Sequence, residues 1–190
     1  MTEHTAGTRN TERTRRALLD ATRRLLGELG TGITLAMVAE AAGVTKSGLL
    51  HHFSSRDALL IAALDDANDR FRAEVMTHLD LSENVPGKLL RAYVRAIADV
   101  GSEASELFGA ASFWMGIQGI AGGPELMRAD AARWREELLA DGLPLDLVRI
   151  VQRAIEGMAG AYSSGEETED ELRTTADQLI FLTFHPPTIR

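Results

Sequence analysis

Two short helical segments separated by a glycine constrain this chain more than any other feature of its sequence. Thr34 and Thr45 each stand where a side-chain hydroxyl caps a helix, and the helices they begin are expected at 35–42 and 46–52. Gly43 lies between them. A tight turn between steeply crossing helices needs a residue that adopts positive φ, and glycine does so without steric cost. The spacing therefore predicts a helix-turn-helix.

The apolar residues of this segment fit the core of a small three-helix domain. Ala39 lets the two helices cross closely, Val38, Val44 and Leu49 lie at offsets that face inward, and Phe53 closes the base. The second helix then has short polar or small residues on its outer face, which suits a DNA major groove about 12 Å wide. An ordinary helical hairpin with a glycine turn is the alternative interpretation.

Helical periodicity continues along the rest of the chain, and no strand-like alternation stands out. Residues 1–10 bury little and are expected to form a disordered tail. Glycines and prolines separate the later segments. The further helices are expected at 11–29, 57–79, 88–100, 104–120, 125–140, 145–162 and 170–184. We therefore predict an all-α fold of about nine helices.

Charge divides the chain near residue 56. The net charge is −8, but residues 1–56 hold eight Lys or Arg against five Asp or Glu, whereas residues 57–190 hold twelve against twenty-three. A uniform nucleic-acid binder is normally basic, so this asymmetry predicts a basic module at 11–56 on an acidic body at 57–190.

Two stretches then resemble the N-terminal domain of the tetracycline-repressor (TetR) family of bacterial transcriptional regulators. They are residues 38–46, VAEAAGVTK, and residues 51–60, HHFSSRDALL; residues 155–157 are a looser echo of the family's dimerisation helix. The resemblance implies a ligand-responsive homodimer, most simply a repressor, that binds a double-stranded DNA operator. In it the body binds a small-molecule effector and dimerises, and the helix at 57–79 links the two parts.

Two residues depart from the family's pattern. Leu50 stands where the family usually has a tyrosine whose hydroxyl contacts a phosphate, and Ser47 stands where it often has glycine. Leu50 donates no hydrogen bond, although it suits contact with a thymine methyl group. Both changes affect which operator sequence is expected. DNA binding itself is still expected.

The candidate DNA contacts divide into those to phosphate and those to bases. The hydroxyls of Thr34 and Thr45 suit phosphate or act as helix caps alone, and Lys46 suits either a base or a phosphate. Arg13 and Arg16 reach phosphate or form a solvated face. The full set is Thr34, Thr45, His52 and Arg56 for phosphate, and Lys46, Ser47, Leu50 and His51 for bases, with Gly48 permitting close approach.

The acidic body contains a candidate effector pocket. Its helix near residues 107–120 is uncharged and mixes aromatic with small residues, which leaves room for a mostly apolar ligand beside one amide. A normal core that needed small residues is the alternative. The candidate lining residues are Tyr93, Phe108, Phe113, Trp114, Gln118, Trp134 and Met158.

The apolar stripe of the helix at 145–162 is too wide for one packed face, and two glycines would let another helix approach. An interior helix of a monomer is the alternative interpretation. A dimer would place two recognition helices about 34–36 Å apart, the spacing of two half-sites. The candidate interface residues are Val151, Ala154, Gly157, Ala161 and Leu179.

Other classes of function have little support in the sequence. No nucleophile–base pair, catalytic carboxylate pair or phosphate-binding loop is visible, and the chain has no cysteine, so we expect neither an enzyme nor a cofactor. The adjacent histidines point about 100° apart and predict no metal site. Without a visible secretory signal or membrane span, we expect a cytoplasmic protein with no membrane partner. A helical interaction or ligand-sensing scaffold that no longer reads DNA is the competing hypothesis.

Overall fold

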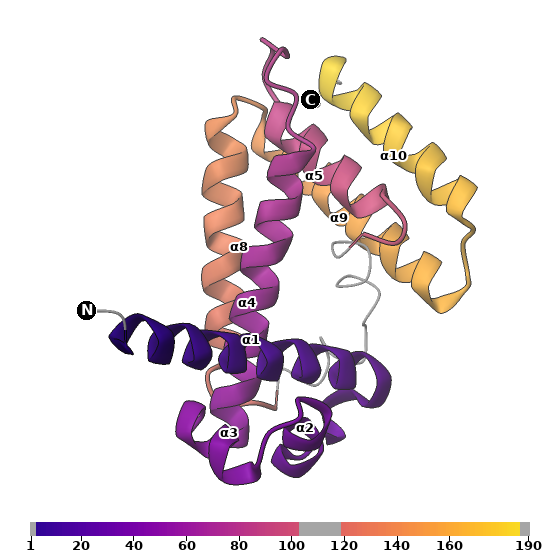
Figure 1. The fold of residues 1–190 in the computed structure, drawn as a ribbon. Helices are drawn as coiled ribbons and strands as arrows, with labels where there is room; N and C mark the ends of the chain where they lie inside the picture. The colour runs from indigo at the N-terminus through magenta and orange to yellow at the C-terminus, as the bar shows by residue number, and fades with distance from the viewer. Residues whose placement is uncertain (1–2, 103–118, 187–190) are drawn as a thin grey trace. The chain divides into compact units, whose positions relative to one another are not determined.

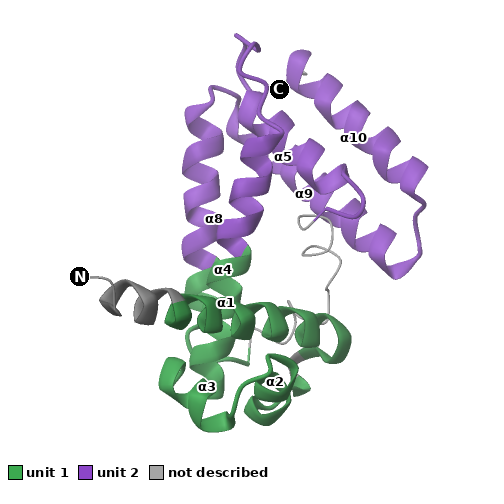
Figure 2. Ribbon diagram, in the orientation of Figure 1, with its two compact units in different colours: residues 1–67, 112–127 green, residues 68–111, 128–190 purple. Residues whose placement is uncertain are grey.

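The computed structural model describes residues 3–102 and 119–186 (Figure 1). This part of the chain contains eight α-helices, one short 3-10 helix and no strand, so the all-α prediction is confirmed. It divides into two compact units, residues 1–67 with 112–127 and residues 68–111 with 128–190 (Figure 2). None of the described helices is both long and apolar enough to span a bilayer.

Unit 1 is built on a long first helix and two short ones. It comprises α1 (Glu3–Leu29), the 3-10 turn η1 (Gly30–Gly32), α2 (Leu35–Ala41), α3 (Lys46–His52) and the first half of α4 (Arg56–Thr77). Its core includes eight large side chains that are each at most 4% exposed, namely Leu18, Leu26, Ile33, Val38, Leu49, Phe53, Leu59 and Leu60. The two short helices therefore hold their places by burying a few large residues.

Unit 2 is organised around α5 (Lys88–Ala98), which packs against both α9 (Leu145–Ser164) and α10 (Glu169–Phe184) (Figure 1). Eight of the eleven residues of α5 are buried. The second half of α4 and most of α8 (Gly123–Ala140) complete the unit. A helix that is buried on most sides lies at the centre of a core, so the other helices of unit 2 pack around α5.

Arg91 lies fully buried on the first turn of α5. Its guanidinium donates to Glu83 Oε2 at 2.5 Å, to Thr183 Oγ1 at 3.1 Å and to the Pro86 carbonyl at 2.9 Å. Burial raises the pKa of Glu83, but hydrogen bonds from Arg95 and Arg91 outweigh it and hold that pKa below its ordinary value. A buried charge is tolerated because every part of it is paired.

The observed helix bounds lie close to those expected from the sequence, and most ends have a visible physical cause. The hydroxyl of Ser55 accepts a hydrogen bond from Ala58 N at 3.0 Å at the start of α4. Thr168 begins α10 through a reciprocal capping box with Glu171, which the sequence analysis did not anticipate. The helix expected at 104–120 lies almost wholly outside the described residues.

Two boundaries differ from expectation. First, α1 begins at Glu3, where a disordered tail to residue 10 was expected. Residues 3–10 contain no proline, and extending an existing helix costs far less than nucleating one.

Second, unit 1 extends to residue 67 and includes 112–127, where a boundary at 56 was expected. Leu59, Leu60, Ala63 and Leu64, on the first turns of α4, are all buried, which ties that half of the helix to unit 1.

Candidate nucleic-acid interface

Helix α3 buries one face and leaves the opposite face in solvent. Leu49 is fully buried, whereas Lys46, Ser47 and His51 are exposed and Leu50 is 43% exposed. The sequence analysis assigned these four exposed residues to base contacts. A short helix that leaves polar, cationic and apolar groups uncovered together suits the edges of bases in a major groove.

A threonine hydroxyl fixes the start of α3. Thr45 Oγ1 accepts a hydrogen bond from Gly48 N at 3.1 Å and lies 3.1 Å from Ser47 Oγ. A Cβ atom built on Gly48 would lie 3.2 Å from the same Oγ1. Glycine therefore avoids a close contact between a side chain and the capping hydroxyl. It also leaves no side chain protruding from this part of the helix, which suits close approach of a phosphate backbone.

The turn between α2 and α3 depends on the backbone conformation of Gly43. Its φ is +68°, and a Cβ built there would meet no atom within 4 Å, so glycine is needed for its conformation rather than for space. Gly43 N donates to the Glu40 carbonyl at 3.0 Å and Val44 N donates to the Ala39 carbonyl at 2.9 Å. This is the left-handed turn that the sequence predicted.

The remaining residues predicted to contact phosphate differ in their exposure and in their hydrogen bonds. Thr34 is exposed and caps α2 by accepting from Met37 N at 3.3 Å. His52 is half-buried, whereas its neighbour His51 is exposed. Arg56 is half-buried too, and its Nε donates to the Ile33 carbonyl at 2.8 Å. Arg56 therefore ties the start of α4 to the loop before α2, a structural contact that its sequence position did not reveal.

One cation of α1 lies beside the base of α3. The Arg15 guanidinium carbon is 4.7 Å from the ring centroid of Phe53, within the range of a cation–π contact, and Arg15 is otherwise exposed. Arg13 instead donates to Asn10 Oδ1 at 2.9 Å. The sequence analysis named Arg13 and Arg16 and missed Arg15, because only the tertiary structure brings this position to Phe53.

The helix-turn-helix segment is similar in sequence to known proteins. Residues 18–63 match the family model for bacterial regulatory proteins of the tetR family. This segment of the chain is therefore similar to the domain that defines the tetR family. An 86-residue stretch is 35% identical to the HTH-type transcriptional regulator BetI of Burkholderia thailandensis, covering 45% of this chain and 44% of BetI.

Two further similarities extend beyond the tetR-family domain. The HTH-type transcriptional regulator RutR of Escherichia coli K12 is 28% identical over 156 residues, which cover 80% of this chain and 63% of RutR. The matches to BetI and RutR thus span less than two thirds of those proteins. A transcriptional regulator from Rhodococcus sp. Rha1 has the same fold, with a TM-score of 0.75 at 21% identity over 95% of this chain and 98% of that one. The family and these relatives are transcriptional regulators rather than enzymes.

In the acidic body of the chain, two predicted pocket residues lie together in a buried aromatic cluster. The rings of Tyr93 and Trp134 meet edge to face at 5.1 Å, and Phe71, which the sequence analysis did not name, lies 5.2 Å from Tyr93. Met158 is half-buried against the same core. The other four candidates, Phe108, Phe113, Trp114 and Gln118, lie outside the described residues.

Polar groups border the aromatic cluster. Tyr93 donates its hydroxyl proton to Glu156 Oε1 at 2.6 Å, and burial, followed by the Glu156 charge, raises the pKa of Tyr93 well above its usual value. The Arg72 guanidinium lies 4.0 Å over the Trp134 ring. Asn68 is 7% exposed, and its side-chain NH₂ has no hydrogen-bond partner among the described residues. A buried amide in that state is a group that a ligand can satisfy.

The predicted dimer residues fall on two different faces. Val151 and Leu179 are buried in the core of unit 2. Ala154 and Ala161 are half-buried, and Gly157 is exposed with open space where a Cβ would be.

Helical spacing places Ala154, Gly157 and Ala161 on the same stripe of α9 as Ile150, which is 53% exposed. On α10, Phe181 is 59% exposed. Ile150 belongs to the apolar stripe that the sequence predicts for the interface, whereas Phe181 is exposed apolar surface that was not assigned to it.

Proposed function

We propose that this chain is a DNA-binding transcriptional regulator that binds a palindromic operator as a homodimer and is released by a small, mostly apolar effector. The observation that carries the proposal is the outer face of α3. Lys46, Ser47, Leu50 and His51 are uncovered on it, while Leu49 anchors the helix from beneath. Repression follows most simply from occupying an operator in the absence of ligand.

Binding as a dimer supplies what a single recognition helix lacks. Seven residues of α3 reach too few base pairs for a specific site, whereas two copies at about one helical turn of DNA read two half-sites. Ile150 and Phe181 offer exposed apolar surface in unit 2 for self-association. The small stripe residues beside Ile150 would allow close packing of a second α9.

The effector proposal draws on the buried aromatic cluster and on the amide of Asn68. Both lie on or beside α4, whose first half belongs to unit 1 and whose second half belongs to unit 2. A ligand that binds one arrangement of this helix better than another shifts the population toward it. The chain would then be released from the operator because the ligand-bound dimer no longer fits both half-sites at once.

Selection of bound duplexes from a random DNA pool tests the central proposal. The wild-type chain should enrich a palindromic motif, and a variant carrying Lys46→Glu and Leu50→Glu should enrich none while keeping the wild-type unfolding temperature. Failure of the wild-type chain to enrich any motif at low salt, with and without candidate ligands, would overturn DNA reading and leave the scaffold hypothesis.

Sedimentation equilibrium tests the dimer separately. Ile150→Glu and Phe181→Glu should each shift the chain toward monomer. Met76→Glu is the matched control, because Met76 on α4 is exposed to the same extent as Ile150, at 53%. Equal dimer populations in all three variants would place the interface elsewhere.

An effector is tested by adding apolar compounds to the operator complex and recording release. The variant Asn68→Leu should change the concentration that gives half-release while leaving operator affinity without ligand unchanged. If it behaves as wild type with every active compound, Asn68 takes no part in recognition.

A further inference from the structure

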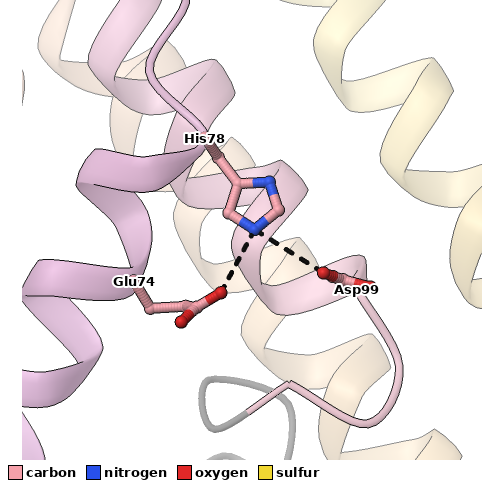
Figure 3. Close-up of side chains that lie close together, drawn as sticks. All are labelled: Glu74, His78 and Asp99. Atoms are coloured by element: carbon pink, nitrogen blue, oxygen red, sulfur yellow. Dashed lines mark ion pairs between the residues drawn. The ribbon is translucent and has the colours of Figure 1, made fainter.

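Three potential metal ligands lie together at one end of unit 2. Glu74 is on the last turn of α4, His78 directly follows that helix, and Asp99 is the C-terminal cap residue of α5 (Figure 3). His78 Nε2 is 3.5 Å from Glu74 Oε1 and 3.7 Å from Asp99 Oδ2, and the three ligand atoms all lie within 4.8 Å of one another. Figure 3 shows both carboxylates directed at the same ring nitrogen.

The backbone holds each of these groups in place. His78 N donates to the Val75 carbonyl at 3.1 Å, so the chain keeps turning just after α4 and His78 lies on the same side as Glu74, four residues before it. The end of α5 is fixed by Asp99 N, which donates to the Arg95 carbonyl at 3.0 Å, and by Ser102 N, which donates to the Asp99 carbonyl at 3.0 Å. The three side chains therefore meet because α5 ends beside the last turns of α4.

The spacing is wide for hydrogen bonds and close to that of a coordination shell. Good hydrogen bonds between nitrogen and oxygen span about 2.7–3.2 Å. Zinc binds nitrogen and oxygen at about 2.0–2.2 Å, so two ligands of a tetrahedral site lie roughly 3.3–3.6 Å apart. The two measured separations from His78 Nε2 are 3.5 and 3.7 Å. The two carboxylate oxygens lie within 4.8 Å of each other, so they would move closer by up to roughly an ångström to enclose an ion.

The charge of the three side chains and their partial exposure to solvent both favour a divalent cation. Two carboxylates and a neutral imidazole carry a net charge of −2, which a divalent cation neutralises. The side chains of His78, Glu74 and Asp99 are 23%, 30% and 55% exposed, so the ion has a route in and a position left for water. One nitrogen and two oxygens suit zinc and its first-row neighbours better than the all-oxygen sites of calcium.

We propose that Glu74, His78 and Asp99 form a binding site for one divalent transition-metal ion of the zinc class. The bound ion would link the C-terminal end of α4 to the end of α5 within unit 2. Each carboxylate supplies one oxygen and His78 supplies Nε2. The proposal does not depend on DNA binding, and it stands or falls separately from it.

Titration of the untagged, chelator-treated full chain with Zn²⁺ tests the site. Isothermal calorimetry should find one ion per chain, and the unfolding temperature should rise with zinc concentration. His78→Gln should weaken binding by at least about 100-fold, because even losing a partner outside the ligand shell costs 10–100-fold. His185→Gln is the matched control, since His185 is exposed and belongs to a different cluster, stacked on Phe181.

A cysteine variant gives a direct spectroscopic reading. The chain contains no cysteine, so Asp99→Cys introduces the single thiolate available to a metal. Co²⁺ added to this variant should give a thiolate-to-cobalt charge-transfer band in the near ultraviolet, and His78→Gln in the same background should weaken it. Equal zinc affinity in the wild type and His78→Gln, or no charge-transfer band in the cysteine variant with its fold intact, would overturn the proposal.

Discussion

The hydroxyl of Thr45 has two proposed roles that substitutions at one position can separate. It caps α3 by accepting from Gly48 N at 3.1 Å, and it is exposed to solvent, where we propose that it contacts a phosphate. Replacing a threonine cap with alanine costs about 1 kcal/mol, within a range of roughly 0.5–2. For a chain of this size that lowers the unfolding temperature by about 2–4 °C. Thr45→Ala should therefore fold, with a small, measurable loss of stability.

The effect on operator affinity should be much larger. A hydrogen bond to a charged group contributes about 1.5–3 kcal/mol, and a dimer would lose one such bond at each half-site. The sum is about 3 kcal/mol at the low end, which corresponds to roughly 100-fold in affinity. Thr45→Ser retains the hydroxyl and should bind the operator nearly as well as the wild type.

Thr45→Asp is the decisive variant. Aspartate is an excellent N-cap, and its charge suits the positive end of the helix dipole, so the unfolding temperature should stay at or above the wild-type value. The same charge would face DNA phosphates, so affinity should fall further than in Thr45→Ala. Thermal unfolding and fluorescence anisotropy with the selected operator measure the two quantities. A stable aspartate variant with wild-type affinity would refute the placement of this helix end at the phosphate backbone.

Three further predictions follow from the described contacts. Gly43→Ala should lose about 1 kcal/mol in urea unfolding, because φ is +68° there; no loss would show that the turn relaxes. Glu83 has a pKa lowered in the folded state, so the stability it contributes is present above its unfolded pKa and lost as pH falls through the folded value. Glu83→Gln should therefore lose on the order of 3 kcal/mol at pH 7 and show a weaker acid dependence below about pH 4.5 than the wild type; parallel pH profiles would contradict this. The double variant His51→Gln with His52→Gln should bind the operator more weakly than the wild type in fluorescence anisotropy; unchanged affinity would place both rings away from the DNA.

The recognition domain could be predicted closely because its signals are local. The caps at Thr34 and Thr45 and the turn at Gly43 each act within four residues of sequence, so spacing alone located α2 and α3. Arg56 and Arg15 show the limit of that method. Their contacts with the Ile33 carbonyl and the Phe53 ring depend on how α1, α3 and α4 pack, and no nearby residue indicates them.

The body was harder to predict because an apolar stripe does not say which of its sides faces the protein's own core. Val151 and Ile150 are neighbours of similar hydrophobicity, yet the first is fully buried and the second is 53% exposed. Only packing of α9 against α5 and α10 separates them. The same reasoning explains the cluster of Glu74, His78 and Asp99. Glu74 and His78 have helical spacing that a sequence shows, but the third ligand lies twenty-one residues beyond His78, at the end of α5. Because tertiary structure brings the third residue to the other two, this set of residues can be found in the folded chain and not in its sequence.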